Sequence, residues 1–363
     1  MDILEKILKS KKHPLDTFSK ATDKTFTSIP RLRSGIYSFD LALGGGLPEG
    51  RIITLAGPEH SGKSMTLGLL IAATQRLCKI CNLIESVCKC PEFTQRKNFF
   101  YVDVECSLDT DWFKALGVDL DRLYVALPEY GEQAVDLAIA ALSEPDIDMV
   151  VFDSAAALVP VGDEDRVAGD FKIGNEAMLV KHLVQRGTSA LIRRRRAGNY
   201  VTLLLATQLR KNISTGRASW GQPEHKIFGG KALEHFSSCI VLFSKGKWLM
   251  WTGKAPAGDD LPQLANASCW MKKNKAGKPG LIHGEFQVCF RPGRGYEEGQ
   301  VVQHNTLIKA ATDLGLYEGA TNIKSYGFCG ETFDSKKQLV QRLTADRQFS
   351  WETCRQLVDV ALE

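Results

Sequence analysis

The stretch RIITLAGPEHSGKS, residues 51–64, decides the fold that this sequence predicts. Its first half is an apolar run typical of a buried strand, and its second half matches the pattern G-x-x-x-x-G-K-[ST]. A predicted helix, SMTLGLLIAATQRL (64–77), follows directly. A strand, a glycine-rich loop and a helix in this order form a P-loop, whose backbone N–H groups and helix N-terminus bind phosphate. We assign the nucleotide to the loop residues Gly57, Pro58, Glu59, His60, Ser61, Gly62, Lys63 and Ser64.

Five side chains have predicted chemical roles at this site. Lys63 should reach the β- and γ-phosphates of ATP, and Ser64 should bind Mg²⁺. Asp153 ends one predicted strand and should hold the metal, whereas Glu105 ends another and should orient the attacking water. A purely structural role is the alternative for Glu105. Gln208 also ends a strand, where its amide could sense the γ-phosphate.

Predicted strands alternate with predicted helices over most of the chain. The further strands are FFYVDVE (99–105), DMVVFD (148–153), YVTLLLATQ (200–208) and CIVLFSK (239–245), and GEQAVDLAIAALS (131–143) is a second core helix. This alternation indicates an α/β fold with a mainly parallel twisted sheet and right-handed crossovers. Ligands of such sheets bind at the carboxyl ends of the strands.

Three regions are predicted along the chain. Residues 1–34 contain a short helix over 2–12 and a linker, 35–304 form the P-loop core, and 305–363 form a small α-rich domain. Its predicted helices are NTLIKAATDLGL (305–316), KKQLVQRLTAD (336–346) and SWETCRQLVDVALE (350–363), the last with Ser350 as its N-cap. Because so short an N-terminal helix is marginal alone in water, we expect it to dock on another surface; packing on its own domain is the alternative.

Charge is spread unevenly over the 363 residues. The total is 46 Lys and Arg against 42 Asp and Glu, but 141–176 carry nine acidic and two basic residues, whereas 177–223 carry nine basic and no acidic ones. The run Arg193–Arg196 is interpreted as a solvated helix face. The composition, 44% apolar and 24% charged, excludes disordered, collagen-like and coiled-coil classes. Without a secretory signal pattern or a membrane-spanning stretch, we expect a cytoplasmic protein with no membrane partner.

A long polar segment closely follows the strand predicted over 200–208. Its sequence is RKNISTGRASWGQPEHKIFGG (210–230). Segments of about 20 residues without regular structure inside a compact domain are usually functional or disordered. Arg210, Lys211 and Arg217 surround one aromatic residue, Trp220. This combination suits single-stranded nucleic acid, because basic groups neutralise phosphates and an aromatic ring stacks on bases. A disordered surface loop is the alternative.

Ten short motifs occur along the chain in a fixed order. They are SFDLALGGGLPEGRI (38–52), GPEHSGKS (57–64), YVDVECSLD (101–109), LGVDLDRL (116–123), GEQA (131–134), VVFDSAAALVP (150–160), TQLR (207–210), FGGKALE (228–234), KKNKAG (272–277) and FQVCFRPGRG (286–295). Together they make the sequence resemble RecA-family recombinases over nearly its whole length. The resemblance implies a DNA-dependent ATPase that forms a helical filament on single-stranded DNA, pairs it with homologous double-stranded DNA and exchanges strands.

The resemblance also implies roles for individual residues. Asp109 and Trp112 would hold the adenine, and Lys273 and Lys275 of the K-N-K element would reach the ATP of the neighbouring protomer. Gln208 would relay the state of the γ-phosphate to the DNA. The implied DNA-contacting segments are 161–170 and 209–227, together with Gly229 and Gly230. The N-terminal helix would dock on the adjacent subunit.

The sequence departs from the family pattern at several positions. Ser64 stands where bacterial members usually carry Thr, His60 replaces a small residue, and Thr207 stands where Asn is usual. A strongly acidic C-terminal tail is missing. These differences point to a viral or otherwise divergent member.

The largest departure is an insertion, LCKICNLIESVCKCPEFTQRKN (77–98), with the spacing C-x₂-C-x₆-C-x-C. Its cysteines Cys78, Cys81, Cys88 and Cys90 could close a tetrahedral zinc site and so fold an insert too small for its own core. Free thiols on a mobile loop and an iron–sulfur cluster are the alternatives. The six other cysteines are interpreted as small core residues.

Two other classes of function stay open on the sequence. A RecA-fold helicase or branch-migration motor also couples ATP to DNA, but such motors form hexameric rings and lack the K-N-K element. A non-catalytic recombination mediator would keep the fold alone. The presence of Lys63, Glu105 and Asp153 argues against that second class.

Overall fold

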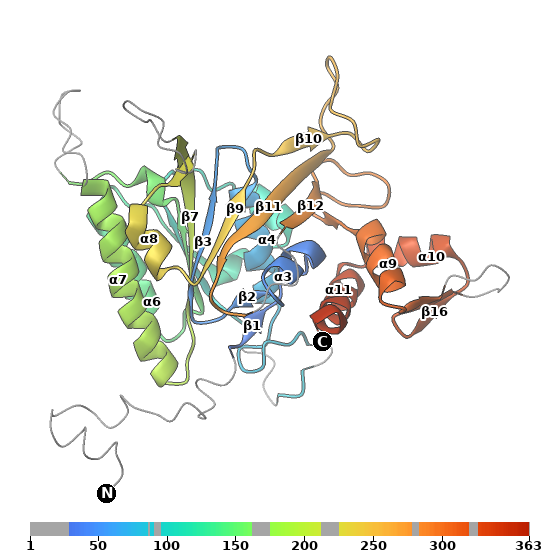
Figure 1. Cartoon of the computed structure of the whole chain (residues 1–363), viewed down its shortest axis with the longest axis horizontal. Coiled ribbons are helices and arrows are strands. Elements are labelled where there is room, and N and C mark those ends of the chain that lie inside the picture. Colours follow the sequence, from blue (N-terminus) through green and yellow to red (C-terminus); the bar gives the residue numbers. More distant parts are fainter. Residues whose placement is uncertain are drawn as a thin grey trace, which may run out of the picture.

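The computed structural model describes residues 29–85, 88–90, 96–161, 175–211, 225–277, 283–318 and 326–362 (Figure 1). Among them, six neighbouring strands of an eleven-stranded sheet run parallel, in the order β9-β3-β7-β6-β4-β5. These strands are β3 (Ile52–Gly57), β4 (Phe99–Asp103), β5 (Leu123–Ala126), β6 (Met149–Asp153), β7 (Thr202–Lys211) and β9 (Cys239–Phe243). The predicted α/β fold with a mainly parallel core sheet is confirmed.

Antiparallel strands extend this sheet beyond β9. The extension runs β9-β11-β12-β13, while β10 pairs with β11 and β8 pairs with the end of β7. These strands are β8 (His225–Ile227), β10 (Lys247–Leu249), β11 (Leu264–Asn274), β12 (His283–Cys289) and β13 (Val301–Val302). A separate antiparallel pair, β1 (Arg31–Leu32) and β2 (Leu47–Pro48), precedes the P-loop strand.

Helices cover both faces of the sheet, as Figure 1 shows. One apolar cluster joins the sheet to α3 (Tyr37–Ala42), α4 (Lys63–Gln75) and α5 (Thr110–Leu116). A second cluster on the opposite face joins it to α6 (Gly131–Ser143), α7 (Asn175–Arg196) and α8 (Gly230–Phe236). Because both faces are covered, the central strands are apolar throughout, which is why they are recognisable in the sequence.

The C-terminal region contains helices at the three predicted places and also a small sheet. The helices are α9 (His304–Asp313), α10 (Lys336–Ala345) and α11 (Arg347–Leu362), and the strands are β14 (Tyr317–Glu318), β15 (Tyr326–Phe328) and β16 (Glu331–Phe333). The prediction of an α-rich region therefore missed a three-stranded sheet, whose strands are too short to give a periodic pattern. Ser350 as an N-cap is wrong, because α11 begins at Arg347; the capping side chain is Ser335, which accepts the N–H of Gln338 at the start of α10.

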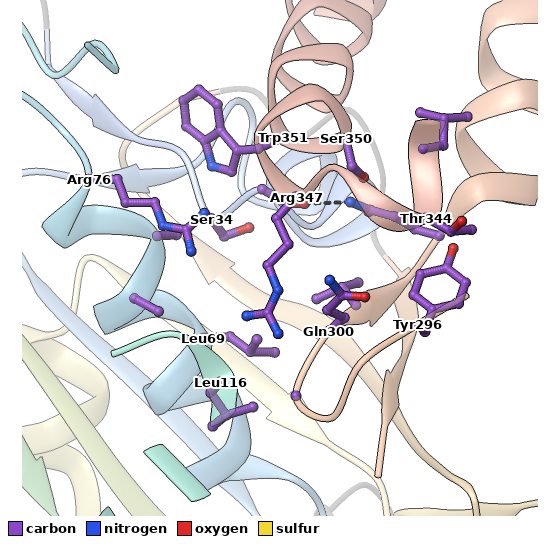
Figure 2. A pocket seen from close by; sticks show the side chains of 17 residues that line it. Ser34, Leu69, Arg76, Leu116, Tyr296, Gln300, Thr344, Arg347, Ser350 and Trp351 are labelled. Atoms are coloured by element: carbon purple, nitrogen blue, oxygen red, sulfur yellow. Dashed lines mark hydrogen bonds between the residues drawn. The ribbon is translucent and has the colours of Figure 1, made fainter. Parts of the chain in front are cut away.

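The C-terminal helices pack directly on the core. Figure 2 shows Trp351 and Arg347 facing Leu69 and Leu116 across a shared pocket. Trp351 is buried in the same apolar cluster as both leucines. The Arg347 guanidinium donates to the carbonyl of Ala115 at 3.3 Å and to that of Glu298 at 3.1 Å. These contacts fix α11 against the helices that follow the P-loop.

A buried carboxylate in α3 gives the fold a pH dependence. Asp40 is fully buried and accepts backbone N–H groups from Ser34 at 2.9 Å and Gly35 at 3.2 Å. Burial raises the pKa of Asp40 from 3.8 to about 6, although these hydrogen bonds lower it. Between the two values the folded chain holds a proton that the unfolded chain has released. The free energy of unfolding therefore falls as the pH rises through this window, by about 3 kcal/mol from this group.

We expect Asp40→Asn to remove this pH dependence. The variant should show a flatter plot of unfolding free energy against pH between pH 4 and 6 than the unmodified chain, measured by urea unfolding. Asp136→Asn is the control, because Asp136 is exposed on α6 in a pair with Arg186. Equal slopes for the unmodified chain and Asp40→Asn would contradict the prediction.

No helix among the described residues is long and apolar enough to cross a lipid bilayer. The N-terminal helix predicted over 2–12 lies outside the described residues, and so does nearly all of the segment 161–170.

Candidate nucleotide site and metal centre

The P-loop connects β3 to α4 at the carboxyl edge of the sheet. Its turn into the helix passes through Gly62, whose φ of 87° lies in the left-handed region that favours glycine. The Lys63 ammonium donates to the carbonyls of Gly57 at 3.1 Å and Pro58 at 2.8 Å. Desolvation lowers the pKa of Lys63, and the charges of Asp153 and Glu105 oppose that shift. The lysine side chain therefore lies against the backbone of the loop that is predicted to bind phosphate.

Ser64 and Asp153 lie together, as expected of a magnesium site. The Ser64 hydroxyl donates to Asp153 Oδ2 at 3.1 Å, and the Tyr101 hydroxyl donates to the same oxygen at 2.7 Å. Burial raises the pKa of Asp153, while the hydrogen bond from Tyr101 lowers it. A hydroxyl and a carboxylate oxygen are ligands that Mg²⁺ prefers. Sequence reasoning missed Tyr101, since an aromatic residue inside an apolar strand reads only as core.

Glu105 lies two residues beyond the end of β4. Asp103 pairs in register with Asp153, so the two strands end side by side. The Ser154 hydroxyl, directly after Asp153, donates to Glu105 Oε1. Glu105 is exposed to solvent, so its second oxygen has access to water. The structure thus brings the predicted base and the predicted metal ligand to one edge.

An aromatic pocket of about 270 Å³ opens beside the P-loop. Its walls are His60, Ser61, Gly62, Lys63, Ser64, Met65, Trp112, Gly246, Lys247, Trp248, Ala265, Asn266 and Phe290. The rings of Trp112 and Phe290 lie 5.4 Å apart. Asp109 is not among these residues; its carboxylate caps α5 by accepting the backbone N–H groups of Asp111 and Trp112. Of the two residues expected at the adenine, only Trp112 lines this pocket.

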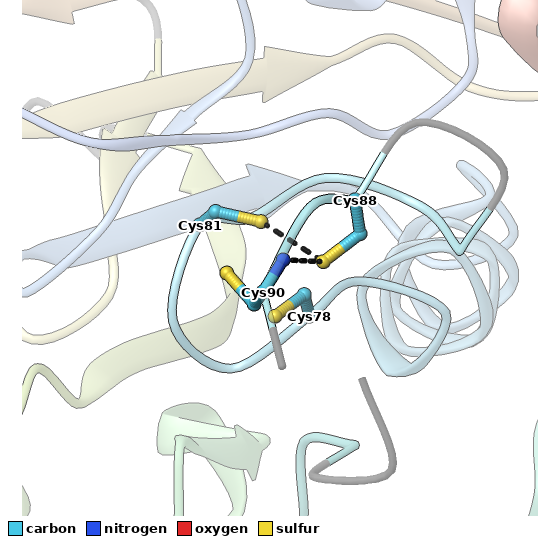
Figure 3. Close-up of side chains that lie close together, drawn as sticks. All are labelled: Cys78, Cys81, Cys88 and Cys90. Atoms are coloured by element: carbon cyan, nitrogen blue, oxygen red, sulfur yellow. Dashed lines mark hydrogen bonds between the residues drawn. The ribbon is translucent and has the colours of Figure 1, made fainter. Parts of the chain in front are cut away.

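The four clustered cysteines converge on one point (Figure 3). The sulfur atoms of Cys78, Cys81, Cys88 and Cys90 all lie within 4.8 Å of one another. In a tetrahedral zinc site with Zn–S bonds of about 2.3 Å, sulfur atoms lie about 3.8 Å apart. The backbone N–H of Ile80 donates to Cys78 Sγ, and that of Cys90 donates to Cys88 Sγ, each at 3.4 Å. The donor set therefore fits a structural zinc ion.

The insert is tied to the core by a buried ion pair. Lys97, only 2% exposed, donates to Glu49 Oε1 at 2.7 Å, and the side chain of Asn82 donates to Glu49 Oε2 at 2.7 Å. Glu49 closely precedes the P-loop strand. At the other side of the insert, Lys79 pairs with the buried Asp148 at 3.5 Å. The cysteine cluster is thus fixed between the end of α4 and the start of β4.

Comparison with known protein families matches residues 3–254 to the RecA N-terminal domain. This chain belongs to the RecA family. Protein RecA of Nitratidesulfovibrio vulgaris (strain Miyazaki F) is 32% identical over 341 residues, 93% of this chain and 83% of that protein. Protein RecA of Campylobacter fetus subsp. fetus is 29% identical over 85% of this chain and 79% of its own length, and that of Helicobacter pylori (strain Shi470) is 31% identical over 81% and 75%. Membership supports an ATP-dependent recombinase for DNA recombination and repair.

Gln208 of this RecA-family chain lies directly beside the P-loop. In the parallel pairing of β3 and β7, its partner is Gly57. Its carbonyl accepts the N–H of Phe228 at 3.0 Å, and the Thr207 hydroxyl donates to the carbonyl of Phe228 at 3.2 Å. These bonds join β7 to β8 and to the glycines that follow, of which Gly229 caps α8. Thr207 thus has a structural role here in place of the usual Asn.

The structure describes only some of the residues that are expected to contact DNA. Arg210 and Lys211 lie in β7, beyond Gln208, and Gly229 and Gly230 begin α8 with φ of 96° and 66°. Arg217 and Trp220 lie outside the described residues. The prediction that this strand ends at Gln208 is wrong, because β7 continues to Lys211 and so includes the first two residues of the polar segment 210–230.

Of the two lysines in the RecA K-N-K element, Lys273 lies on β11 and Lys275 directly follows the end of that strand at Asn274. Lys273 donates to the carbonyls of Glu234 and His235 at the end of α8, the latter at 3.1 Å. Desolvation lowers the pKa of Lys273, and the charge of Lys275 lowers it further. Neither lysine is among the residues that line the pocket within one chain.

Two sequence interpretations need correction. The run at the end of α7 is not solvated throughout, because Arg194 is buried and donates to the carbonyls of Pro145 at 3.1 Å and Ile147 at 2.9 Å. These carbonyls follow the C-terminal end of α6, where the helix dipole also favours a cation. Four of the six remaining cysteines are buried, but Cys329 is half-buried and Cys106 is exposed, so the core interpretation is wrong for Cys106.

Proposed function

We propose that this chain is a DNA-dependent ATPase that polymerises on single-stranded DNA and catalyses homologous pairing and strand exchange. The observation that supports it most is the convergence of four side chains at the carboxyl edge of the sheet. Lys63 and Ser64 come from the P-loop, Asp153 from β6 and Glu105 from the end of β4. A phosphate-binding loop, a metal ligand and a base in one place are what γ-phosphate hydrolysis requires.

Each of these residues has a distinct task. Lys63 exchanges the carbonyls of Gly57 and Pro58 for the β- and γ-phosphate oxygens. Ser64 and Asp153 hold Mg²⁺, which when bound neutralises charge on the phosphates. Glu105 orients the attacking water and accepts its proton, and the hydrogen bond from Ser154 fixes the carboxylate for that task.

An open strand edge supports assembly into a filament. Among the described residues β5 is the last strand of the sheet, and its neighbourhood exposes large apolar side chains: Tyr124 is 53%, Val125 44% and Leu127 62% exposed. Unpaired strand edges with apolar side chains accept a strand from another chain. We assign this edge to the N-terminal segment of the neighbouring protomer, with Lys273 and Lys275 reaching that protomer's nucleotide.

DNA contact is assigned to the segments that leave the sheet next to the nucleotide. Arg210, Lys211 and Arg217 neutralise phosphates, and Trp220 stacks on a base. Because these contacts release counterions, DNA affinity should fall steeply with salt although the net charge is only +4.

The test is ATP turnover with and without single-stranded DNA, combined with a three-strand exchange assay and negative-stain images. We expect DNA-stimulated hydrolysis, strand exchange and helical filaments. Hexameric rings would favour the helicase or motor class. Binding of ATP without turnover would favour a mediator and contradict the proposal.

We further propose that the cysteine cluster holds one structural Zn²⁺. Four thiolates close a tetrahedral site that leaves no open position, so the ion supplies folding energy to the insert and takes no part in hydrolysis. The purified chain should carry about one zinc per protein, and Cys88→Ser should lose it. Elemental analysis and thiol titration measure both. Four freely titrating thiols with no zinc would contradict the site, and visible absorption with bound iron would identify a cluster instead.

A further inference from the structure

The short strand β10 is anchored to the P-loop. The backbone N–H of Gly246, one residue before β10, donates to the carbonyl of His60 at 3.0 Å. A Cβ atom at position 246 would lie 2.5 Å from that carbonyl oxygen, closer than real Cβ atoms approach. Only glycine allows this contact, which ties the start of β10 to the phosphate loop.

This anchoring holds Trp248 at the aromatic end of the nucleotide pocket. Trp248 pairs with Ala265 of β11, and both residues line the pocket with Lys247. Its ring lies 5.0 Å from that of Phe290, edge to face, and Phe290 lies 5.4 Å from Trp112. Phe290 thus contacts two indole rings, and all three rings line the pocket beside the P-loop.

The side chain of Trp248 is exposed to solvent, although its strand pairs with β11 and begins next to the contact with the P-loop. Its side chain is 47% exposed, whereas Trp351 is only 7% exposed. Exposed large aromatic groups beside a pocket lose contact with water when a flat ligand covers them, which is favourable. The P-loop fixes the position of the phosphates, so the base of the same nucleotide extends toward these rings.

We propose that Trp248 is a base-stacking residue of the nucleotide site and selects purine over pyrimidine nucleotides. This inference rests on the proposed ATPase function. A purine presents a larger π-face than a pyrimidine, and stacking on an aromatic side chain contributes roughly 1–3 kcal/mol per base, or about 5-fold to 150-fold in affinity. Trp112 and Phe290 supply one side of the base pocket, and Trp248 supplies the wall that β10 adds.

The test compares Trp248→Gln with Trp270→Gln. Trp270 is the matched control, because it lies on the neighbouring strand β11, is 37% exposed and does not line the pocket. Glutamine suits both positions since neither ring is buried. Calorimetry measures the dissociation constants of ADP, CDP and inorganic tripolyphosphate, and circular dichroism verifies folding.

We expect Trp248→Gln to weaken ADP binding about tenfold, to reduce the preference for ADP over CDP, and to leave tripolyphosphate binding unchanged. Trp248→Phe should restore most of the ADP affinity, and Trp270→Gln should change none of the three constants. ADP affinity within twofold of the unmodified chain would overturn the inference. Equal weakening of tripolyphosphate would also overturn it, because Trp248 would then support the P-loop only. Failure of the unmodified chain to bind ADP would instead contradict the proposed ATPase.

Discussion

Replacing Glu105 with glutamine is expected to slow ATP hydrolysis by at least about 100-fold while ATP binding is retained. Glutamine keeps the shape of the side chain but cannot accept a proton from water. It can still accept the hydrogen bond from Ser154, so the geometry of the β4 and β6 ends is preserved. Filaments on DNA should therefore form with ATP and persist longer than those of the unmodified chain.

Steady-state phosphate release measures the rate, and binding of a fluorescent ATP analogue measures affinity. Lys63→Ala is the contrasting variant, because it removes the phosphate contact and should abolish nucleotide binding or turnover. Ser154→Ala tests the positioning of Glu105 and should lower the rate less than Glu105→Gln does. Hydrolysis by Glu105→Gln at the unmodified rate would show that another group activates the water.

Replacing Lys97 with methionine is expected to reduce the free energy of unfolding by about 3–5 kcal/mol. The change leaves the Glu49 carboxylate buried without its cation, and among the described residues Asn82 remains as its side-chain hydrogen-bond donor. Methionine fills most of the lysine's volume, so the loss reports the charge more than a cavity. Thermal and urea unfolding measure the effect.

An exposed ion pair of the same residue types provides the control. Lys272 pairs with Glu234 at 2.6 Å, with side chains 36% and 42% exposed, and Lys272→Met should cost less than about 1 kcal/mol. The double variant Lys97→Met with Glu49→Leu should recover part of the loss, since no buried charge is left unpaired. A loss below 1 kcal/mol for Lys97→Met would contradict the buried-pair interpretation.

The parts of the fold predicted from sequence are those whose signal is local. Local apolar patterns predict the P-loop strand, the helix over 131–143 and the strand over 148–153, and the structure places each within one residue of the prediction. β14, β15 and β16 have no such pattern because two- and three-residue strands depend on pairing partners. Arg194 was misread for the same reason: its partners are carbonyls about 50 residues earlier in the chain.

The residues of the candidate site also fall into those with a local sequence signal and those without one. The first group lies at or after the ends of parallel strands, so sheet geometry alone brings its members together: Lys63, Ser64, Asp153 and Glu105. Tyr101 and Trp248 could not be found from sequence, because a tyrosine inside a buried strand and a tryptophan in a polar stretch become informative only once their neighbours in space are known. Knowing which strands pair would have identified both residues, but strand pairing cannot be determined from one sequence.

The pairing of Gln208 with Gly57 sets how far a signal from the nucleotide must travel. One interstrand spacing, about 4.8 Å, separates the backbone of the phosphate loop from β7. Arg210 lies two residues further along the same strand, roughly 7 Å away. If Arg210 contacts DNA as proposed, communication between nucleotide and DNA needs no relay through the body of the domain. On that proposal, a movement of the Gln208 side chain within β7 would be enough to carry the signal.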